Sequence, residues 1–300
     1  MTDGPAPEAV RYHGRDFTPD DLEVIRGIAA RLPTRNQIAQ AVCQALGWRR
    51  IDGRPKDMSA RLALLRMADD GLITLPPPRN RNGNGRHTRY LPPDPQLALD
   101  LDAQPMPATL ATLGPIRLAV VEDSAASTRW RTLIATHHYL GHAPFAGAQL
   151  RYLAESSHGT VAALGFAASA WKCAPRDTHI GWDAATREAR LHLVVGNARF
   201  LIPPQVTVPN LASHLLAAAA RRLAADWQQR YGYRPVLLET FVETGRFTGA
   251  AYKAANWTCV GQTKGRGKLD HHHQRAVPVK DIYLRPLHRH WRRILTAPPT

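Results

Sequence analysis

The chain has 300 residues, 44% of them hydrophobic, and its 39 Lys and Arg outnumber 24 Asp and Glu to give a net charge of +15. This composition excludes a broadly disordered chain and favours an anionic partner such as nucleic acid, although the arginine bias of a GC-rich genome gives the same balance. The three widely spaced cysteines exclude a disulfide framework and a cysteine zinc site, and the lack of an apolar signal region or of an apolar run of ~18 residues predicts a cytoplasmic protein without a membrane partner.

Three amphipathic helices are predicted after a loose segment at residues 1–16. Thr18 followed by Pro19 predicts the start of the first helix, because threonine caps a helix and proline suits its first turn. The second helix is expected from Thr34 to Leu46 and the third from Lys56 to Asp70, where Gly71 is a stop signal. The apolar side chains expected to face the core from the third helix are Met58, Leu62, Leu65 and Met67.

A short strand and a hairpin are predicted after the third helix. Leu72–Leu75 has the pattern of a strand, and the Asn-Gly pairs within residues 82–85 favour a tight turn. Three helices and a hairpin are the order of a winged helix-turn-helix, so residues 17–91 are predicted to bind DNA, with a protein-contact module as the alternative. The expected DNA-contacting side chains are Lys56, Arg61 and Arg66 in the recognition helix, Arg49, Arg50 and Arg54 before it, and Arg79, Arg81, Arg86 and Arg89 in the wing.

A proline-rich stretch at residues 92–115 is predicted to link this module to a larger domain at residues 116–290, which a tail at 291–300 follows. We expect the long alanine-rich helix at 211–229 to precede a strand at 236–242, which lies beside the strand ending near Ile202. The other expected elements are a helix at 128–136, strands at 116–121, 150–154, 161–169, 190–195 and 200–202, a helix at 249–255, and strands at 258–262 and 281–284.

This order of elements resembles that of the GCN5-related acetyltransferases, and Ala250–Gly261 looks like the late helix and strand of that superfamily. The resemblance implies an α/β (α+β) domain with a mixed sheet, and acyl transfer as an alternative function. A CoA diphosphate needs a glycine-rich turn at the start of the long helix, where backbone N–H groups face the phosphates. Residues Val208–His214 contain no glycine, which argues against CoA as a cofactor.

Six motifs, at residues 138–141, 176–182, 197–201, 210–214, 238–242 and 261–267, resemble in their order those of the DruA family. Members of this family occur in Druantia anti-phage systems, and related proteins accompany mobile elements. The resemblance, over about residues 20–290, implies a protein that acts on DNA in phage defence or in a mobile element, with other proteins of such systems as partners. A metal-dependent enzyme of DNA strand cleavage or transfer and a non-catalytic adaptor are the alternatives.

Acidic and basic residues in apolar surroundings are the first candidates for chemistry. Asp177, in a polar loop, is predicted to bind a divalent metal such as Mg²⁺ or to orient a base, and Arg176 to hold a phosphate, with an Arg–Asp clamp as the alternative. Glu239 lies within an apolar strand, where a carboxylate is costly unless it is paired or coordinated. It is therefore predicted to be a metal ligand or a base, with a salt bridge to Arg199 as the alternative. We expect Asp177 and Glu239 to lie within reach of each other, with Arg176 or His214 nearby.

Histidine and tyrosine provide further candidates. His138 and Tyr139 follow a helix and are predicted to transfer a proton or to act as a nucleophile, with a cap and a core residue as the alternatives. His214 opens the long helix and is a candidate of the same kind, or a cap. The run at residues 271–273 lacks the partner spacing of a metal site and is interpreted as a polar loop.

The C-terminal part of the chain is strongly basic. Residues 245–300 hold eleven Lys or Arg and two Asp, which favours contact with a nucleic-acid backbone, whereas a solvated tail is the alternative. The candidates in its flexible loop are Lys264, Arg266 and Lys268.

Overall fold

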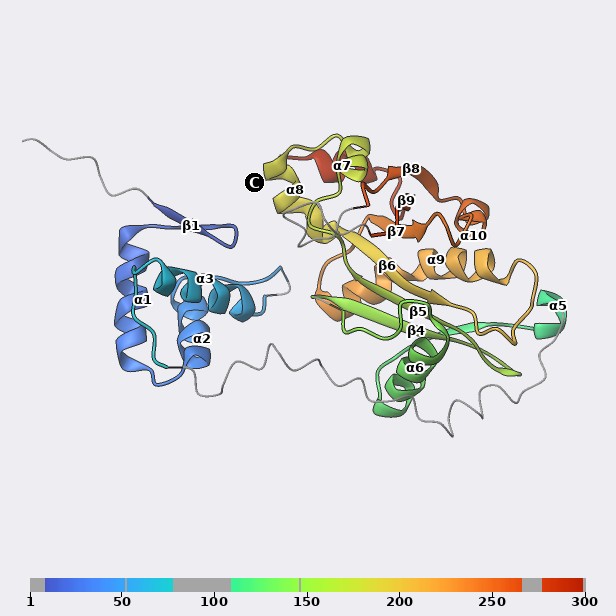
Figure 1. Ribbon diagram of the computed structural model, residues 1–300, viewed down its shortest axis with the longest axis horizontal. Helices are drawn as coiled ribbons and strands as arrows, with labels where there is room; N and C mark the ends of the chain where they lie inside the picture. The colour runs from blue at the N-terminus through green and yellow to red at the C-terminus, as the bar shows by residue number, and fades with distance from the viewer. Residues whose placement is uncertain (1–8, 52, 78–108, 146, 266–276, 299–300) are drawn as a thin grey trace, which may run out of the picture. The chain divides into compact units, whose positions relative to one another are not determined.

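The computed structural model describes residues 9–51, 53–77, 109–145, 147–265 and 277–298. Contacts between residues divide the chain into two units, Met1–Arg89 and Tyr90–Thr300, which carry separate hydrophobic cores (Figure 1).

The first unit contains the three predicted helices. They are α1 (Pro19–Arg31), α2 (Arg35–Ala45) and α3 (Asp57–Asp69). Thr18 caps α1 through a capping box with Asp21, as the Thr-Pro pair predicts, and Thr34 caps α2. Ile25 and Ile38 are fully buried between the helices.

Two predictions for this unit are wrong, and a third is untested. Residues 10–17 form a hairpin of β1 (Val10–Tyr12) and β2 (Arg15–Phe17), not a loose segment, because His13 and Gly14 adopt the positive φ of a tight turn and Phe17 packs into the core. Leu72–Leu75 is not a strand. The predicted wing, with Arg79, Arg81, Arg86 and Arg89, lies outside the described residues.

The apolar phase of α3 also differs from the prediction. Met58, Leu62 and Leu65 are 59%, 46% and 37% exposed, whereas Ala60, Ala63 and Leu64 are buried together with Met67. The inner side combines the small Ala60 and Ala63 with Leu64 and Met67, and three other large apolar side chains lie on the outer face. The outer face of the predicted recognition helix is therefore partly apolar.

The second unit is built on a mixed sheet with the strand order β3-β4-β5-β6-β7-β9-β8. All neighbouring strands are antiparallel except β6 and β7, which are parallel, and this pair confirms the prediction that the strand after the long helix lies beside the preceding one. The sheet confirms the predicted mixed α/β fold class. The strands are β3 (Arg117–Val120), β4 (Gln149–Ser156), β5 (Gly159–Ala168), β6 (Val194–Leu201), β7 (Leu237–Glu243), β8 (Thr258–Gln262) and β9 (Lys280–Pro286).

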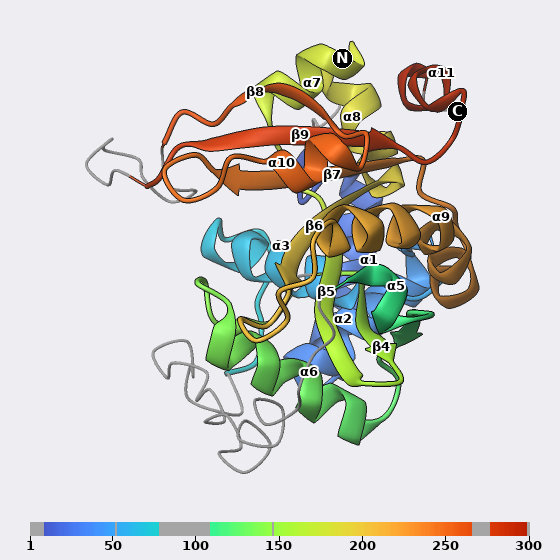
Figure 2. The ribbon, with the colours of Figure 1, turned by 90° about the vertical axis from the view of Figure 1, so that its right-hand side faces the viewer.

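Helices cover both faces of this sheet (Figures 1 and 2). The long helix α9 (Leu211–Tyr231) packs on one face, where α10 (Ala250–Ala254) and the short α5 (Leu110–Leu113) join the same core. The opposite face is covered by α6 (Ser124–His137) over β4 and β5. Towards β7, β8 and β9, that face is covered by α7 (Ala174–Ile180), α8 (Ala184–Arg190) and α11 (Trp291–Thr296).

Several short helices replace predicted loops and strands. Arg176 and Asp177 lie in α7 rather than in a polar loop, and residues 184–193, which include the start of the predicted strand at 190–195, form α8 and the 3₁₀ turn η2 (Leu191–Leu193). The predicted tail contains α11, whose Leu295 is fully buried, and the end of the predicted linker forms α5, whose Leu113 is buried. Among the described residues, no helix is long and apolar enough to cross a membrane.

Candidate functional site

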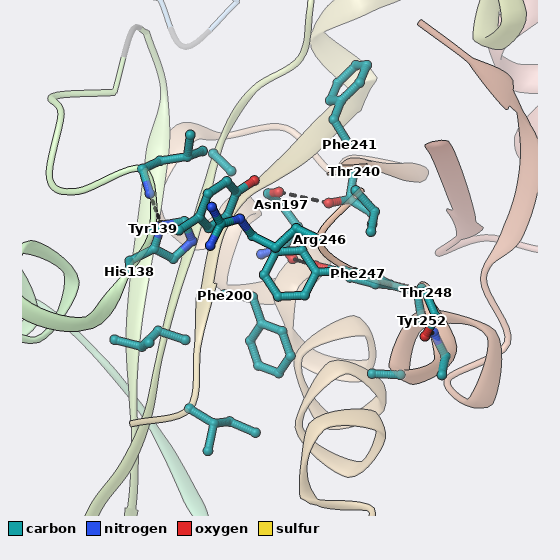
Figure 3. Close-up of a pocket in the computed structure, with 18 of the residues that line it drawn as sticks. His138, Tyr139, Asn197, Phe200, Thr240, Phe241, Arg246, Phe247, Thr248 and Tyr252 are labelled. Carbon is teal, nitrogen blue, oxygen red and sulfur yellow. Dashed lines mark hydrogen bonds between the residues drawn. The ribbon is translucent and has the colours of Figure 1, made fainter. Parts of the chain in front are cut away.

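A cavity opens where the parallel strands β6 and β7 move apart. The two strands pair only from Val194–Gly196 to Leu237–Glu239, although both continue for several residues. Beyond this point the Thr240 hydroxyl donates to the Asn197 carbonyl at 3.1 Å, and a cavity of about 540 Å³ occupies the space between the strands (Figure 3). The volume is typical of a small-ligand site.

The described lining of the cavity is aromatic and small, and it contains no Asp or Glu. Its only Lys or Arg is Arg246. The residues come from the end of α6, from β6 and β7, and from the segment that leads into α10. They are His137, His138, Tyr139, Leu140, Asn197, Ala198, Phe200, Leu201, Ile202, Thr240, Phe241, Val242, Arg246, Phe247, Thr248, Gly249, Ala250, Ala251 and Tyr252.

Asn197 and Tyr252 form a fixed polar group on the wall of the cavity. The Asn197 amide nitrogen donates to the carbonyls of Gly165 and Arg199, at 3.2 and 3.0 Å, and its side-chain oxygen accepts from the Tyr252 hydroxyl at 2.8 Å. Burial raises the pKa of Tyr252 to about 12, so its phenol stays protonated. These bonds leave the tyrosine oxygen with acceptor capacity towards a ligand.

His138 is a neutral hydrogen-bond donor in this cavity. Its Nδ1 accepts from the Leu140 N–H at 3.2 Å, which places the ring proton on Nε2. Burial, and then the charges of Arg199 and Lys280, together lower the pKa of His138 to about 4. The geometry therefore presents His138 as a donor, whereas the predicted role in proton transfer remains a prediction.

We expect the ring of His138 to titrate near pH 4 in the folded protein, as followed by NMR. Because the pKa of His138 is lowered from 6.5, the unfolded chain binds the proton more tightly. Stability should therefore fall as the pH is lowered from about 6.5 towards 4. The variant His138→Gln should show a smaller fall in urea titrations over this range, and an unchanged fall would contradict the assignment.

Tyr139 presents a stacked ring rather than an activated hydroxyl. Its ring stacks on His138 with centroids 4.9 Å apart and meets Phe247 edge to face at 5.4 Å. The Arg246 guanidinium lies 4.9 Å from the ring centroid. Burial and then Glu243 raise the pKa of Tyr139, with Arg199 and Arg246 opposing them. Nothing in this arrangement lowers the barrier to nucleophilic attack, so the nucleophile role remains a prediction.

The predicted carboxylates meet at one buried guanidinium group. Arg176 is fully buried; its Nη1 donates to Glu239 and to the Ala170 carbonyl, both at 2.8 Å, and its Nε donates to Asp177 at 2.9 Å. This confirms that Asp177 and Glu239 lie within reach of each other with Arg176 nearby. Glu239 is paired with Arg176, not with Arg199.

Both carboxylates are also held by neutral donors. Ala170 N–H donates to the second oxygen of Glu239 at 2.8 Å, and the Trp182 indole and Cys173 N–H donate to Asp177. Burial raises the pKa of Glu239, and its contacts with Arg176 and Ala170 oppose this shift. The group therefore ties the β5–α7 segment to β7 as a clamp. The described residues contain no cluster of three or more His, Cys, Asp or Glu that could hold a metal ion.

The other predicted site residues lie apart from this clamp. His214 is exposed in the first turn of α9 and does not line the cavity. Lys264 is exposed after β8, whereas Arg266, Lys268 and residues 271–273 lie outside the described residues. In the first unit, Arg49, Arg50, Arg54 and Arg66 are exposed, and Lys56 and Arg61 are half-buried.

The start of α9 does not fit a CoA diphosphate. Asn210 adopts a left-handed conformation at the N-cap, Pro209 precedes it, and the Leu211 N–H is already bonded to the Val208 carbonyl. No residue of this turn lines the cavity.

Asn197, Phe247 and Tyr252 were not predicted from the sequence as site residues. Asn197 and Thr240 each stand in one of the motifs that carry the family resemblance. Each is the fourth residue of its strand, and a polar residue at the same position of two neighbouring strands is a signal of a shared site. Phe247 and Tyr252 lie in loop and helix segments whose position beside the strands follows only from the fold.

Comparisons with known proteins provide the family. Solved structures that align with the chain include an N-acetyltransferase of Staphylococcus aureus Mu50 (8% identity, 58% of this chain and 99% of the other, TM-score 0.37) and a GNAT-family acetyltransferase of Streptococcus pneumoniae (14% identity, 57% and 98%, TM-score 0.36). At these scores the likenesses carry no conclusion about activity. No curated protein matches the sequence. The model of the family described as Druantia protein DruA matches residues 66–274, which is more than half of the chain, and the protein therefore belongs to the DruA family.

Proposed function

We propose that this DruA-family protein binds DNA, and that its α/β unit contacts the phosphate backbone through an arginine cluster formed by Arg131, Arg151, Arg199 and His142. Arg131 lies on α6 and Arg151 on β4, and both donate to Ser127, through its carbonyl and its hydroxyl respectively, at 3.2 and 3.1 Å. Arg131 also donates to the Thr128 hydroxyl. Within the described residues, the side-chain hydrogen bonds of Arg131 and Arg151 thus go to neutral oxygens.

The proposal is supported by the closeness of the arginine charges to one another and to His142. Burial and then Arg131 lower the pKa of Arg151, with Arg230 acting in the same direction, and burial followed by Arg131, Arg151 and Arg199 lowers that of His142. Neighbouring positive charges repel each other in a partly buried site, and an anion relieves this repulsion. Arginine binds phosphate with two parallel N–H groups, which suits a nucleic-acid backbone.

An aromatic base holds the cluster in place. The Arg151 guanidinium lies 5.3 Å from the centroid of the buried Trp130 ring, and His142 meets the same ring edge to face at 6.1 Å. Arg199 lies over Phe145 at 5.9 Å. Side chains held in this way lose little further conformational entropy when they bind a phosphate.

Charge reversal at the cluster tests the proposal. The variant Arg131→Glu/Arg151→Glu should bind duplex DNA roughly 10-fold more weakly or worse at ~150 mM salt, and its salt dependence should be smaller by about 0.9 for each lost phosphate contact. The matched control is Arg221→Glu/Arg234→Glu. It makes the same change in net charge at exposed positions on and after α9, on the other face of the sheet. Equal losses in the two variants would show a general charge effect and contradict the cluster.

The exposed loop before α3 is a second proposed DNA contact. Arg49 and Arg50 stand on one arm and Arg54 on the other, joined by the Arg49–Pro55 bridge and by the Arg50 N–H bond to the Arg54 carbonyl. Because the outer face of α3 carries Met58, Leu62 and Leu65, this loop is better suited to phosphates than the helix itself. Reversal of the three loop arginines, measured in the same titrations, should lower affinity independently of the α/β cluster.

No specific observation favours the other candidate activities. Metal-dependent strand cleavage was predicted from Asp177 and Glu239, whose oxygens are engaged by Arg176 and neutral donors. Acyl transfer lacks a fitting diphosphate turn at the start of α9.

A further inference from the structure

The cavity between β6 and β7 gathers aromatic rings from separate segments around one space (Figure 3). Tyr139 follows α6, Phe200 lies on β6, and Phe247 and Tyr252 flank the start of α10. Tyr139 and Phe247 meet edge to face at 5.4 Å, and Phe200 and Tyr252 at 6.4 Å. Phe241 points away from this group in Figure 3. Rings at such angles and separations provide surfaces on which a flat aromatic ligand can stack.

The rim of the cavity is open on the side of Phe247. This side chain is 46% exposed, and the neighbouring exposed Arg246 lies over Tyr139 and pairs with Glu243 at 3.7 Å. A ligand that covers a large, partly exposed apolar ring gains free energy by removing that ring from water. The rim therefore points to a ligand with an aromatic part.

The walls also carry polar groups of the kind that recognise a base edge. Where β6 and β7 have separated, their facing main-chain groups no longer pair with each other in a ladder. His138 adds a neutral Nε2–H donor, and the nearby carboxylate of Glu243 pairs with Arg246 at the rim. Nucleobases present donors and acceptors in one plane together with a π face.

The cavity adjoins the arginine cluster. Arg199 belongs to the cluster, and its sequence neighbours Ala198 and Phe200 line the cavity. Arg199 also lowers the pKa of both His138 in the cavity and His142 in the cluster, so its charge lies close to both. The cluster and the His138 side of the cavity therefore lie near each other.

We propose that the cavity accepts one nucleobase that is unpaired in, or extruded from, the DNA bound by the arginine cluster. This inference rests on the proposed DNA binding and adds a base-specific site to it. The volume of about 540 Å³ accommodates a base and its sugar. Unpaired and mismatched bases enter most readily, because they have the least stacking and pairing to lose.

The test compares two single-stranded oligonucleotides of equal length and charge, one with a complete set of bases and one with a central run of abasic sites. The intact protein should bind the base-containing strand roughly 10-fold more tightly, which is within the range measured for base stacking on an aromatic side chain. Phe247→Ala, at a partly exposed position, should remove most of this preference. The control is Trp171→Ala, which removes a 51% exposed aromatic ring that does not line the cavity and should preserve the preference.

The outcomes separate this inference from the proposed function. Equal binding of both strands, with affinity still dependent on the arginine cluster, would overturn the base site and leave DNA binding intact. A preference for bases that Phe247→Ala retains and Trp171→Ala removes would place base recognition elsewhere and overturn the proposal. Displacement of the strand by CoA at low concentration would assign the cavity to another ligand. Failure to bind either strand by a protein that still binds duplex DNA would overturn the base site alone, and failure to bind single strands and duplex would overturn both proposals.

Discussion

Replacing Arg176 with methionine is expected to lower the free energy of unfolding by about 3–5 kcal/mol, because it leaves a buried carboxylate without its counter-charge. Glu239 is fully buried and, within the part of the chain that the structure describes, accepts hydrogen bonds from Arg176 and the Ala170 N–H only. The same substitution removes the donors that join Asp177 and the Ala170 carbonyl to β7. Urea unfolding followed by circular dichroism measures the effect, and the midpoint should fall clearly.

Two further variants separate buried charge from loss of packing. Arg176→Met/Glu239→Gln removes both charges and should recover a large part of the lost stability, because pairs of buried charges are often replaceable together. Arg117→Ala breaks a surface pair with Glu155, in which the arginine side chain is 73% exposed, and should change stability by less than about 1 kcal/mol. An Arg176→Met protein as stable as Arg117→Ala would contradict the clamp.

Replacing Gly249 with alanine is expected to lower the free energy of unfolding by about 2–4 kcal/mol, through backbone strain and overpacking together. Gly249 has a φ of +70° at the start of α10, where L-residues with a Cβ are rarely found. A Cβ there would lie 2.2 Å from the Tyr283 hydroxyl oxygen and 2.6 Å from its ring, and Tyr283 is buried in the sheet core. Thermal or urea unfolding measures the loss.

Glycines elsewhere in the chain provide matched controls for the two causes. Gly232 ends α9 with a φ of +77°, and a Cβ added there would meet no atom within 4 Å. Gly232→Ala should therefore cost only the backbone strain of the positive φ, about 1 kcal/mol. Gly245, near Gly249 in sequence, has neither a positive φ nor a neighbour within 4 Å, and Gly245→Ala should be near neutral. Equal effects of Gly249→Ala and Gly232→Ala would show that Tyr283 yields without cost.

The elements with a strong local signal were predictable from the sequence. The capped helices α1 and α2, the alanine-rich helix α9 and the apolar strand β7 all lie close to their predicted ranges. The alternation in β7 also places Glu239 correctly on the face that holds Leu237, opposite Leu238. Periodicity and caps are properties of neighbouring residues, so a single sequence is enough to reveal them.

Only the tertiary structure decided which face of α3 is buried, how α7 and α8 form, and which partners the site residues have. Helices of seven residues have too few turns for periodicity to distinguish them from loops, and packing supplies most of their stability. Arg176 and Glu239 are 63 positions apart, and Asn197 and Tyr252 are 55 apart, so only the path of the chain brings them into contact. The separation of β6 from β7, which makes the cavity, depends in the same way on pairing between distant strands, and no local pattern encodes where that pairing ends.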